Sequence, residues 1–179
     1  MTDDARQLLE LARRRDSEAI AELYHQYAQK IARYIYYRVS DSAVVEDLTA
    51  NVFLIMVEKL PRYQDTGAPF EAWLYRIASA QVADYYRTLK KRPQETLSES
   101  HANGHPSLET MVQDQEYRRR LQLAINQLSE QEQTILFLRF VERKKHEEVA
   151  QKLGKTPQAV AVLQHRALKR LAAMIERGE

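Results

Sequence analysis

Residues 146–171 read HEEVAQKLGKTPQAVAVLQHRALKRL and carry the strongest local pattern in the chain. Their spacing predicts a short helix over 146–152, which ends at Gly154 because glycine readily adopts the left-handed conformation of a helix exit. Thr156 is expected to cap a second helix, with Pro157 at its first position, where the missing N–H costs nothing. Two helices joined by so short a turn predict a helix-turn-helix.

The two faces of the second helix differ in chemistry. The first helix offers Val149 and Leu153 for packing, and the inward face of the second is expected to hold Val160, Ala167 and Leu171. The outward face presents an amide, an apolar side chain and several basic side chains: Gln158, Val162, His165, Arg166 and Lys169. Such groups contact base edges, thymine methyls and phosphates, so this face predicts a DNA-binding surface. A helical hairpin with a solvated basic face is the alternative interpretation.

Helical periodicity extends over most of the remaining chain, and no segment alternates as a strand does. A long helix is marked by one apolar stripe: Ile20, Leu23, Tyr24, Tyr27, Ile31, Tyr34 and Ile35. A shorter helix over about 3–14 is expected before it. Asp41 or Ser42 is expected to cap the next helix, whose apolar side consists of Val45, Leu48, Val52, Ile55 and Met56. A further helix is predicted from about Phe70 to Lys91, and the predicted fold class is all-α.

Residues 93–107, PQETLSESHANGHPS, differ in composition from the helical segments on either side. Their prolines, glycine and serines, with a single leucine, cannot build a core. We therefore predict two small helical modules joined by a flexible acidic linker. The N-terminal module spans 1–92, the linker 93–115 and the helix-turn-helix module 116–179, with helical structure resuming near Leu108.

Charge is unevenly distributed along the chain. Residues 118–179 carry 13 Lys and Arg against 7 Asp and Glu, whereas residues 93–117 carry five carboxylates and no Lys or Arg. A cationic C-terminal module that follows an acidic segment predicts that this module binds a polyanion.

The helix predicted over 70–91 has a second unusual face. Small and cationic side chains recur along it: Arg76, Ala80, Ala83, Arg87, Lys90 and Lys91. Small residues flanked by cations let a nucleic-acid backbone approach, and Tyr63, Tyr85 and Tyr86 offer stacking surfaces. A solvated helix face is the alternative interpretation. Three further residues of this helix are assigned to the core: Trp73, Leu74 and Ile77.

Several classes of protein are excluded by what the sequence lacks. The chain has no cysteine, which excludes a disulfide scaffold, a thiolate zinc site and a cysteine nucleophile. The zinc-protease motif fails at Ala150, where a second histidine would stand, and no phosphate-binding glycine loop or nucleophile elbow occurs. His101 and His105 fall in the linker and are interpreted as solvated. We therefore expect no enzyme activity, no metal, no cofactor and no small-molecule substrate.

No stretch reaches the roughly 18 apolar residues that a membrane span needs, and the first residues do not form a signal peptide. We therefore expect a cytoplasmic protein without direct membrane insertion.

The two modules together resemble the extracytoplasmic-function group of sigma-70-type sigma factors over essentially the whole chain. Residues 45–60, VEDLTANVFLIMVEKL, resemble the polymerase-binding helix of that family. Residues 69–92, PFEAWLYRIASAQVADYYRTLKKR, resemble its −10-reading segment. Residues 128–171, which end in the helix-turn-helix, resemble its −35-reading region.

This resemblance implies that the protein binds core RNA polymerase and promoter DNA. Residues implied to dock on the largest polymerase subunit are Asp47, Asn51, Phe53, Leu54, Val57 and Glu58. Residues implied to hold the melting −10 element are Gln64, Asp65, Arg76, Ala80, Ala83, Arg87, Lys90 and Lys91. Residues implied to read the −35 element are Thr156, Gln158, Val162, His165, Arg166 and Lys169. An anti-sigma factor that covers the polymerase-facing surfaces is implied as a further partner.

The sequence departs from the family at three places. Ala50 and Asn51 stand where a Gln-Glu or Gln-Asp pair is usual, and Ala80 stands where an asparagine is common. Ala161 and Leu163 replace frequent cations of the recognition helix. Two other hypotheses remain open: a stand-alone helix-turn-helix regulator with an N-terminal sensor or dimerisation module, and a helical interaction protein with no DNA role.

Overall fold

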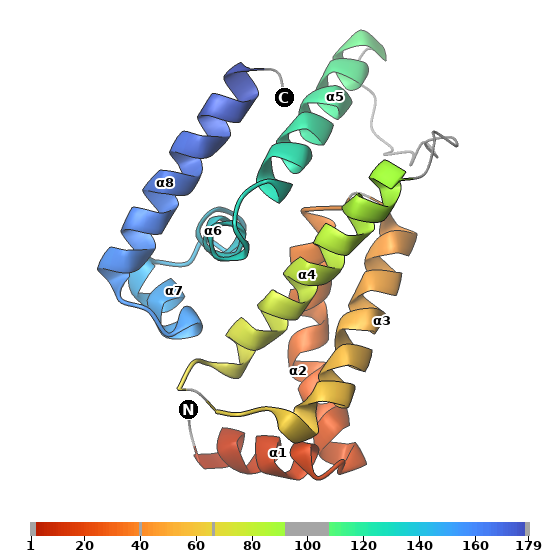
Figure 1. The fold of residues 1–179 in the computed structure, drawn as a ribbon, viewed down its shortest axis with the longest axis vertical. Helices are drawn as coiled ribbons and strands as arrows, with labels where there is room; N and C mark the ends of the chain where they lie inside the picture. Colours follow the sequence, from red (N-terminus) through yellow and green to blue (C-terminus); the bar gives the residue numbers. More distant parts are fainter. Residues whose placement is uncertain (1–2, 40, 66, 92–107, 178–179) are drawn as a thin grey trace.

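The computed structural model describes residues 3–39, 41–65, 67–91 and 108–177. All regular structure in these ranges is helical, which confirms the predicted all-α fold (Figure 1). The elements in chain order are α1 (Asp3–Arg13), α2 (Ser17–Tyr36), α3 (Ser42–Lys59), η1 (Leu60–Arg62), α4 (Phe70–Lys91), α5 (Leu108–Asn126), α6 (Glu130–Leu136), η2 (Phe137–Val141), α7 (His146–Leu153) and α8 (Pro157–Glu176).

The predicted linker lies mostly outside the described residues. Residues 93–107 are not described, and α5 begins at Leu108, where helical structure was expected to resume. Residues 108–115, which the sequence assigned to the linker, are therefore helical. The polar, proline-containing composition ends at 107, and the residues that follow it are mainly good helix formers.

The N-terminal module consists of α1 to α4. Figure 1 shows α2, α3 and α4 running alongside one another, with α1 lying across the ends of α2 and α3. The Asp16 carboxylate accepts a hydrogen bond from the Ala19 backbone N–H at 2.8 Å and so caps α2. Asp41 caps α3 in the same way, as one of the two expected caps, through the backbone N–H groups of Ala43 and Val44.

The apolar stripes predicted for α2 and α3 are largely buried. Leu23, Ile31, Tyr34 and Ile35 of α2 form one side of the core, and Val45, Leu48, Val52 and Met56 of α3 face them. Tyr24 differs from this prediction, because 46% of its surface is exposed. A helical stripe covers a wide angle, and Tyr24 lies at the edge of it.

The C-terminal module consists of α5 to α8 and contains the predicted helix-turn-helix. Gly154 ends α7 with φ 61° and ψ 41°, the left-handed conformation that favours glycine. The Thr156 hydroxyl caps α8 by accepting the Ala159 N–H at 3.2 Å, and Pro157 occupies the first position. Ser129 and Glu132 form the capping box of α6 that their spacing predicts.

The inward face of α8 is divided between two clusters. Val160 packs in the main core together with Val149, as expected. Ala167 and Leu171 were expected to face α7, but they pack in a second cluster against Ala124, Leu128 and Leu136. Because α8 is 20 residues long and α7 only eight, the far half of α8 reaches past α7 to α5 and α6.

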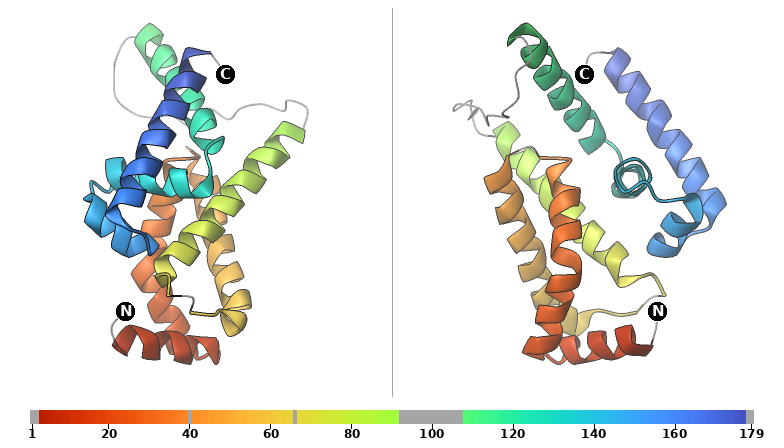
Figure 2. Two further views of the ribbon diagram at one scale, coloured as in Figure 1. Left: turned by 60° about the vertical axis from the view of Figure 1, so that its left-hand side comes forward. Right: turned by 180° about the vertical axis from the view of Figure 1, so that it is seen from behind.

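The two modules share one hydrophobic core. The ring of Phe137, which begins the π-helical segment η2, lies 5.1 Å from the ring of Tyr34 and 6.1 Å from that of Tyr75, centroid to centroid. Ile135, Leu138 and the α7 residues Val149 and Ala150 join the same cluster. Helix α4 contacts both α6 and α7, and Figure 2 shows these two helices on the same side of the N-terminal module. The sequence predicted a linker between modules but not this packing.

Candidate nucleic-acid and protein interfaces

The outward face of α8 is exposed as the sequence predicts. Gln158, His165, Arg166 and Lys169 are all exposed, and 58% of the Val162 surface is accessible. Thr156 is also exposed, although its hydroxyl is engaged in the helix cap. An amide, an apolar contact and cations therefore line one side of a helix whose other side is anchored in the protein.

Two polar contacts that the sequence did not reveal hold α8 in place. The Arg170 guanidinium pairs with the buried Glu132 carboxylate at 2.8 Å, and Arg139 Nε donates to Gln164 Oε1 at 2.9 Å. Burial raises the pKa of Glu132, but hydrogen bonds from Ser129 and the charge of Arg170 outweigh burial and hold this pKa below its usual value. Helix α8 is thus fixed to α6 and η2 by charge-assisted hydrogen bonds.

The second basic face lies on α4. Arg76, Ala80, Ala83, Arg87 and Lys90 are exposed along it, whereas the side chain of Lys91 is not among those described. Arg87 pairs with Asp84 on the same helix at 2.7 Å. Leu74 and Ile77 are buried, and Trp73 packs half-buried against them, so all three belong to the core as expected.

The tyrosines near this face differ in their freedom to stack on bases. The Tyr86 hydroxyl donates a hydrogen bond to the Arg38 carbonyl at 2.6 Å, which ties Tyr86 to the end of α2 and makes it a structural residue. Tyr63 packs against Phe70 and Trp73, at centroid distances of 5.5 and 4.9 Å. Tyr85 is half-buried, with its ring 5.3 Å from that of Tyr86.

The loop before α4 brings the two candidate DNA surfaces close together. Gln64 and Asp65 are exposed, and the Asp65 carboxylate accepts the Gly67 N–H at 2.9 Å in a tight turn. This loop abuts the helix-turn-helix, because a Cβ added at Gly154 would lie 3.4 Å from Ala68 Cα and 3.4 Å from Pro69 Cδ.

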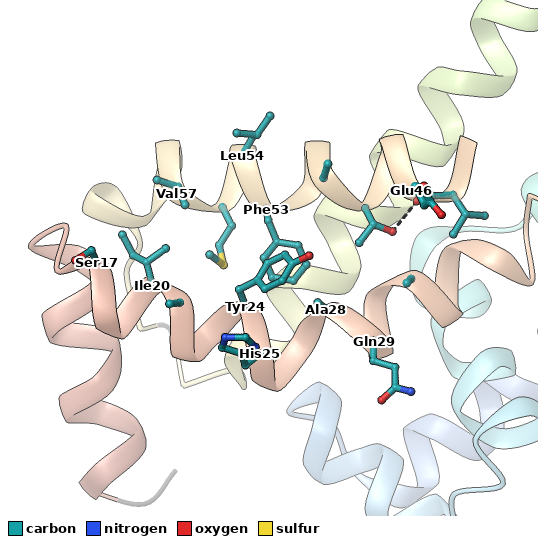
Figure 3. A pocket seen from close by; sticks show the side chains of 16 residues that line it. Ser17, Ile20, Tyr24, His25, Ala28, Gln29, Glu46, Phe53, Leu54 and Val57 are labelled. Carbon is teal, nitrogen blue, oxygen red and sulfur yellow. Dashed lines mark hydrogen bonds between the residues drawn. The ribbon is translucent and has the colours of Figure 1, made fainter. Parts of the chain in front are cut away.

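A groove of about 810 Å³ lies between α2 and α3. We call it the α2/α3 groove; Figure 3 shows its wall, including Ile20, Tyr24, Ala28, Phe53, Leu54 and Val57. Tyr24 and Phe53 meet edge-on inside it, with ring centroids 4.8 Å apart. Leu54 is the most exposed of these, at 68%, and in Figure 3 it points away from α2.

The six residues implied to dock on polymerase fall into two groups. Asp47, Asn51, Leu54 and Glu58 are exposed on α3. Phe53 is only 6% exposed and Val57 is half-buried, so these two shape the groove from within. Tyr24 is one of the groove residues that sequence reasoning missed, since its position in the α2 stripe indicated burial.

None of the described helices is both long and apolar enough to cross a membrane. Within the described ranges, no group of three carboxylate, imidazole or thiolate side chains is placed to hold a metal ion.

A helix-turn-helix with an exposed recognition face, a second basic helix and a separate apolar groove define a DNA-binding protein that also contacts another protein. The family model for Sigma-70 region 2 matches residues 23–92, and that for Sigma-70, region 4 matches residues 118–171. The chain belongs to the extracytoplasmic-function (ECF) group of RNA polymerase sigma factors, and it is a transcription initiation factor that directs RNA polymerase.

Named relatives extend this match over most of the chain. The ECF RNA polymerase sigma factor BldN of Streptomyces coelicolor is 35% identical over 178 residues, which cover 97% of this chain and 67% of BldN. The ECF RNA polymerase sigma factor SigD of Mycobacterium tuberculosis is 35% identical over 164 residues, covering 87% of this chain and 76% of SigD. The solved structure of CnrH in complex with the cytosolic domain of CnrY has the same fold, with a TM-score of 0.57, 20% identity and coverage of 97% and 98% of the two chains.

Proposed function

We propose that each exposed surface has one task in transcription initiation. The outward face of α8 reads the −35 element, α4 and the loop before it hold the −10 element, and the α2/α3 groove with the exposed side of α3 docks on core polymerase. The observation that carries the proposal is the division of side chains between surface and core. Along α4, Arg76, Ala80 and Arg87 are exposed while Leu74 and Ile77 are buried. Along α8, Gln158, Arg166 and Lys169 are exposed while Val160 and Leu171 are buried.

At the −35 element, the N-terminal half of α8 would enter the major groove, as recognition helices do. Gln158 and Val162 belong to this half and are suited to an amide contact with adenine and an apolar contact with a thymine methyl. Arg166 and Lys169 lie further along the helix, where cations meet phosphates. The two kinds of contact are thus separated along α8.

At the −10 element, α4 would support strand separation by binding alone. The exposed Ala80 and Ala83 leave room for a nucleic-acid backbone between Arg76 and Arg87. The free energy of binding the unstacked bases offsets the cost of unstacking them. Strand separation by this route therefore needs no covalent step and no catalytic group. This supports the expectation that the protein is a binding factor rather than an enzyme.

Docking on polymerase would centre on α3. Leu54 projects an apolar side chain into solvent, flanked along the helix by the exposed Asn51 and Glu58. An apolar anchor within a polar rim is the usual composition of a protein interface. An inhibitor of the anti-sigma class would compete by covering the same groove. We therefore also propose that the protein acts in the bacterial cytoplasm, where polymerase and promoters are.

The test is transcription in vitro with purified core polymerase and a library of promoter sequences. We expect transcripts only when core enzyme and this protein are both present, from templates that share paired −35 and −10 motifs. A protein that instead bound duplex alone with nanomolar affinity and gave no transcript would be a stand-alone regulator. A protein that bound neither DNA nor core polymerase would be an interaction protein without a DNA role.

A further inference from the structure

Arg143 lies in the loop between η2 and α7, and its backbone is left-handed, with φ 52°. A residue with a Cβ is strained in this conformation, because the Cβ crowds the carbonyl oxygen, whereas glycine adopts it freely. Gly154, at the other end of α7, takes the same conformation without that strain. Position 143 therefore holds a long cationic side chain where the backbone favours glycine, and backbone strain of this kind clusters at functional sites.

The loop around Arg143 is fixed to the rest of the C-terminal module. The backbone N–H of Lys144 donates to the Leu138 carbonyl at 2.9 Å. The Arg139 guanidinium donates to the Lys144 carbonyl and, through Nε, to Gln164 Oε1 of α8 at 2.9 Å. Arg139 thus holds the loop in a fixed relation to α8, and the left-handed backbone at Arg143 is part of that arrangement.

The cations of this loop are accessible to a ligand. The side chains of Arg143 and Lys145 are exposed, and within the described ranges neither forms an ion pair. Two of the carboxylates that flank them are engaged, because Glu142 pairs with a cation of α2 at 3.2 Å and Glu148 pairs with the third cation of the loop at 3.5 Å. Glu147, on the first turn of α7, is exposed. Two cations are therefore available for a ligand with negative charge.

This loop stands at the start of the first helix of the helix-turn-helix. It ends where α7 begins at His146, and α7 packs against α8 (Figure 1). In DNA complexes of this motif, the second helix lies in the major groove and the first crosses the adjacent backbone. The cations of the loop would then lie next to backbone phosphates, beside the groove that α8 enters. Neither Arg143 nor Lys145 belongs to the outward face of α8, on which the −35 assignment rests.

We propose that Arg143 and Lys145 bind DNA backbone phosphates beside the −35 element, as a second contact surface that adds affinity without reading sequence. The proposal rests on the −35 assignment of α8 above. Phosphate contacts carry no base information, so their loss lowers the affinity for all sequences alike. The left-handed backbone at Arg143 strains the free protein, whereas the cation contributes only when DNA is bound. Replacing Arg143 by glycine should therefore weaken DNA binding without weakening the fold.

Arg143→Gly in the full-length protein tests this expectation. The variant loses one cation and the backbone strain together, so we expect its Tm to be no lower than that of the native protein. Reconstituted with core polymerase, it should bind promoter DNA severalfold more weakly, with a salt dependence reduced by about one charge and unchanged base preference. Fluorescence anisotropy of labelled promoter DNA at several salt concentrations measures the affinity and its salt dependence.

Arg15→Gly is the matched control. Arg15 is also an exposed arginine with a left-handed backbone, at φ 65°, but it lies in the turn between α1 and α2 of the N-terminal module. The two variants lose the same charge and the same kind of strain, and we expect Arg15→Gly to bind DNA as the native protein does. Lys145→Ala should reduce the salt dependence by about one charge, as Arg143→Gly does, although the backbone of Lys145 has a negative φ of −71° and relieves no strain.

The outcomes separate the two proposals. Equal DNA affinity and salt dependence for Arg143→Gly and the native protein would overturn the phosphate contact, and so would an equal loss in Arg15→Gly, which would reflect net charge alone. Loss of core-polymerase binding with DNA binding intact would show that the loop meets an acidic protein surface instead. If even the native protein binds no promoter together with core polymerase, the sigma-factor assignment fails. Titration of the free proteins with duplex DNA then still decides whether Arg143 contributes to phosphate binding.

Discussion

The carboxylate of Glu71 on α4 pairs with the ammonium of Lys152 on α7, with Oε2 and Nζ 2.6 Å apart. The other oxygen of Glu71 accepts a hydrogen bond from the Tyr75 hydroxyl at 3.2 Å. Burial and the neighbouring Glu71 carboxylate together raise the pKa of Tyr75, which keeps this hydroxyl a donor. The pair therefore ties the helix-turn-helix to α4 through a half-enclosed charge contact.

Reversing one charge of this pair is expected to loosen the module junction. Lys152→Glu places two carboxylates opposite each other, and Glu71→Lys with Lys152→Glu restores an ion pair. We expect a coupling free energy of about 1 kcal/mol between the two positions, since contacting charged residues couple by 0.5–3 kcal/mol. Urea unfolding of both single variants and the double variant measures it. Additive effects would mean that the two charges act independently.

Leu54 is expected to anchor the protein on core polymerase. Leu54→Glu should lower the affinity for core enzyme by about tenfold, because a charge would replace an apolar anchor. Helical content should not change, since 68% of the Leu54 surface is exposed. Leu11→Glu, on α1 and 42% exposed, is the matched control. Surface plasmon resonance with immobilised core enzyme gives both affinities, and equal binding by the two variants would contradict the docking assignment.

Glu132 is expected to make the stability of the C-terminal module depend on pH. Its pKa is lower in the folded protein than in the unfolded chain, so the unfolded chain binds a proton first as the pH falls. The stabilisation by Glu132 is therefore fully present above its ordinary pKa of about 4.3 and is lost as the pH falls through the folded value. Glu132→Gln should cost about 1–3 kcal/mol at pH 7, because it weakens a buried charge-assisted contact with Arg170.

Thermal melting from pH 7 to pH 3 measures this effect. The difference in Tm between the native protein and Glu132→Gln should be constant near neutral pH and should narrow below about pH 4.3. A difference that stays constant down to pH 3 would show that the charge of Glu132 contributes nothing.

Along α8, base preference and general affinity are expected to depend on different residues. Arg166→Ala or Lys169→Ala should weaken binding to all sequences and reduce the salt dependence by about one charge. Gln158→Ala or His165→Ala should change the preferred bases, by roughly 1–3 kcal/mol for each lost contact. Because Ala161 and Leu163 carry no charge, we expect more discrimination from amide and apolar contacts. Selection of −35 variants against each protein distinguishes the roles, and they are reversed if Arg166→Ala alone shifts base preference.

The sequence by itself determined the features that depend on residues a few positions apart, which are the helix ends and the buried and exposed faces of each helix. A helix cap joins residues two or three positions apart, and an apolar stripe recurs every three or four positions. The cap at Thr156, the end of α7 at Gly154 and the outward face of α8 therefore follow from local spacing. The same reasoning placed Leu74 and Ile77 in the core and Arg76 and Arg87 at the surface. One further signal was present, because Arg38 follows Tyr34 by four residues and so continues the line of the buried stripe just past the end of α2.

Only the tertiary structure decided how the two modules meet. The hydrogen bonds of Arg38 reach Asn126, 88 positions away, and the ring of Phe137 enters a space formed by α2 and α4. Within the N-terminal module, the packing of α2, α3 and α4 left Tyr24 exposed at the α2/α3 groove and tied Tyr86 to the Arg38 carbonyl just after α2. Contacts of this kind leave no periodic trace in either segment, because each side chain fits its own helix equally well without its partner. These contacts stabilise the protein only when the two surfaces meet, and whether the surfaces meet depends on the whole fold.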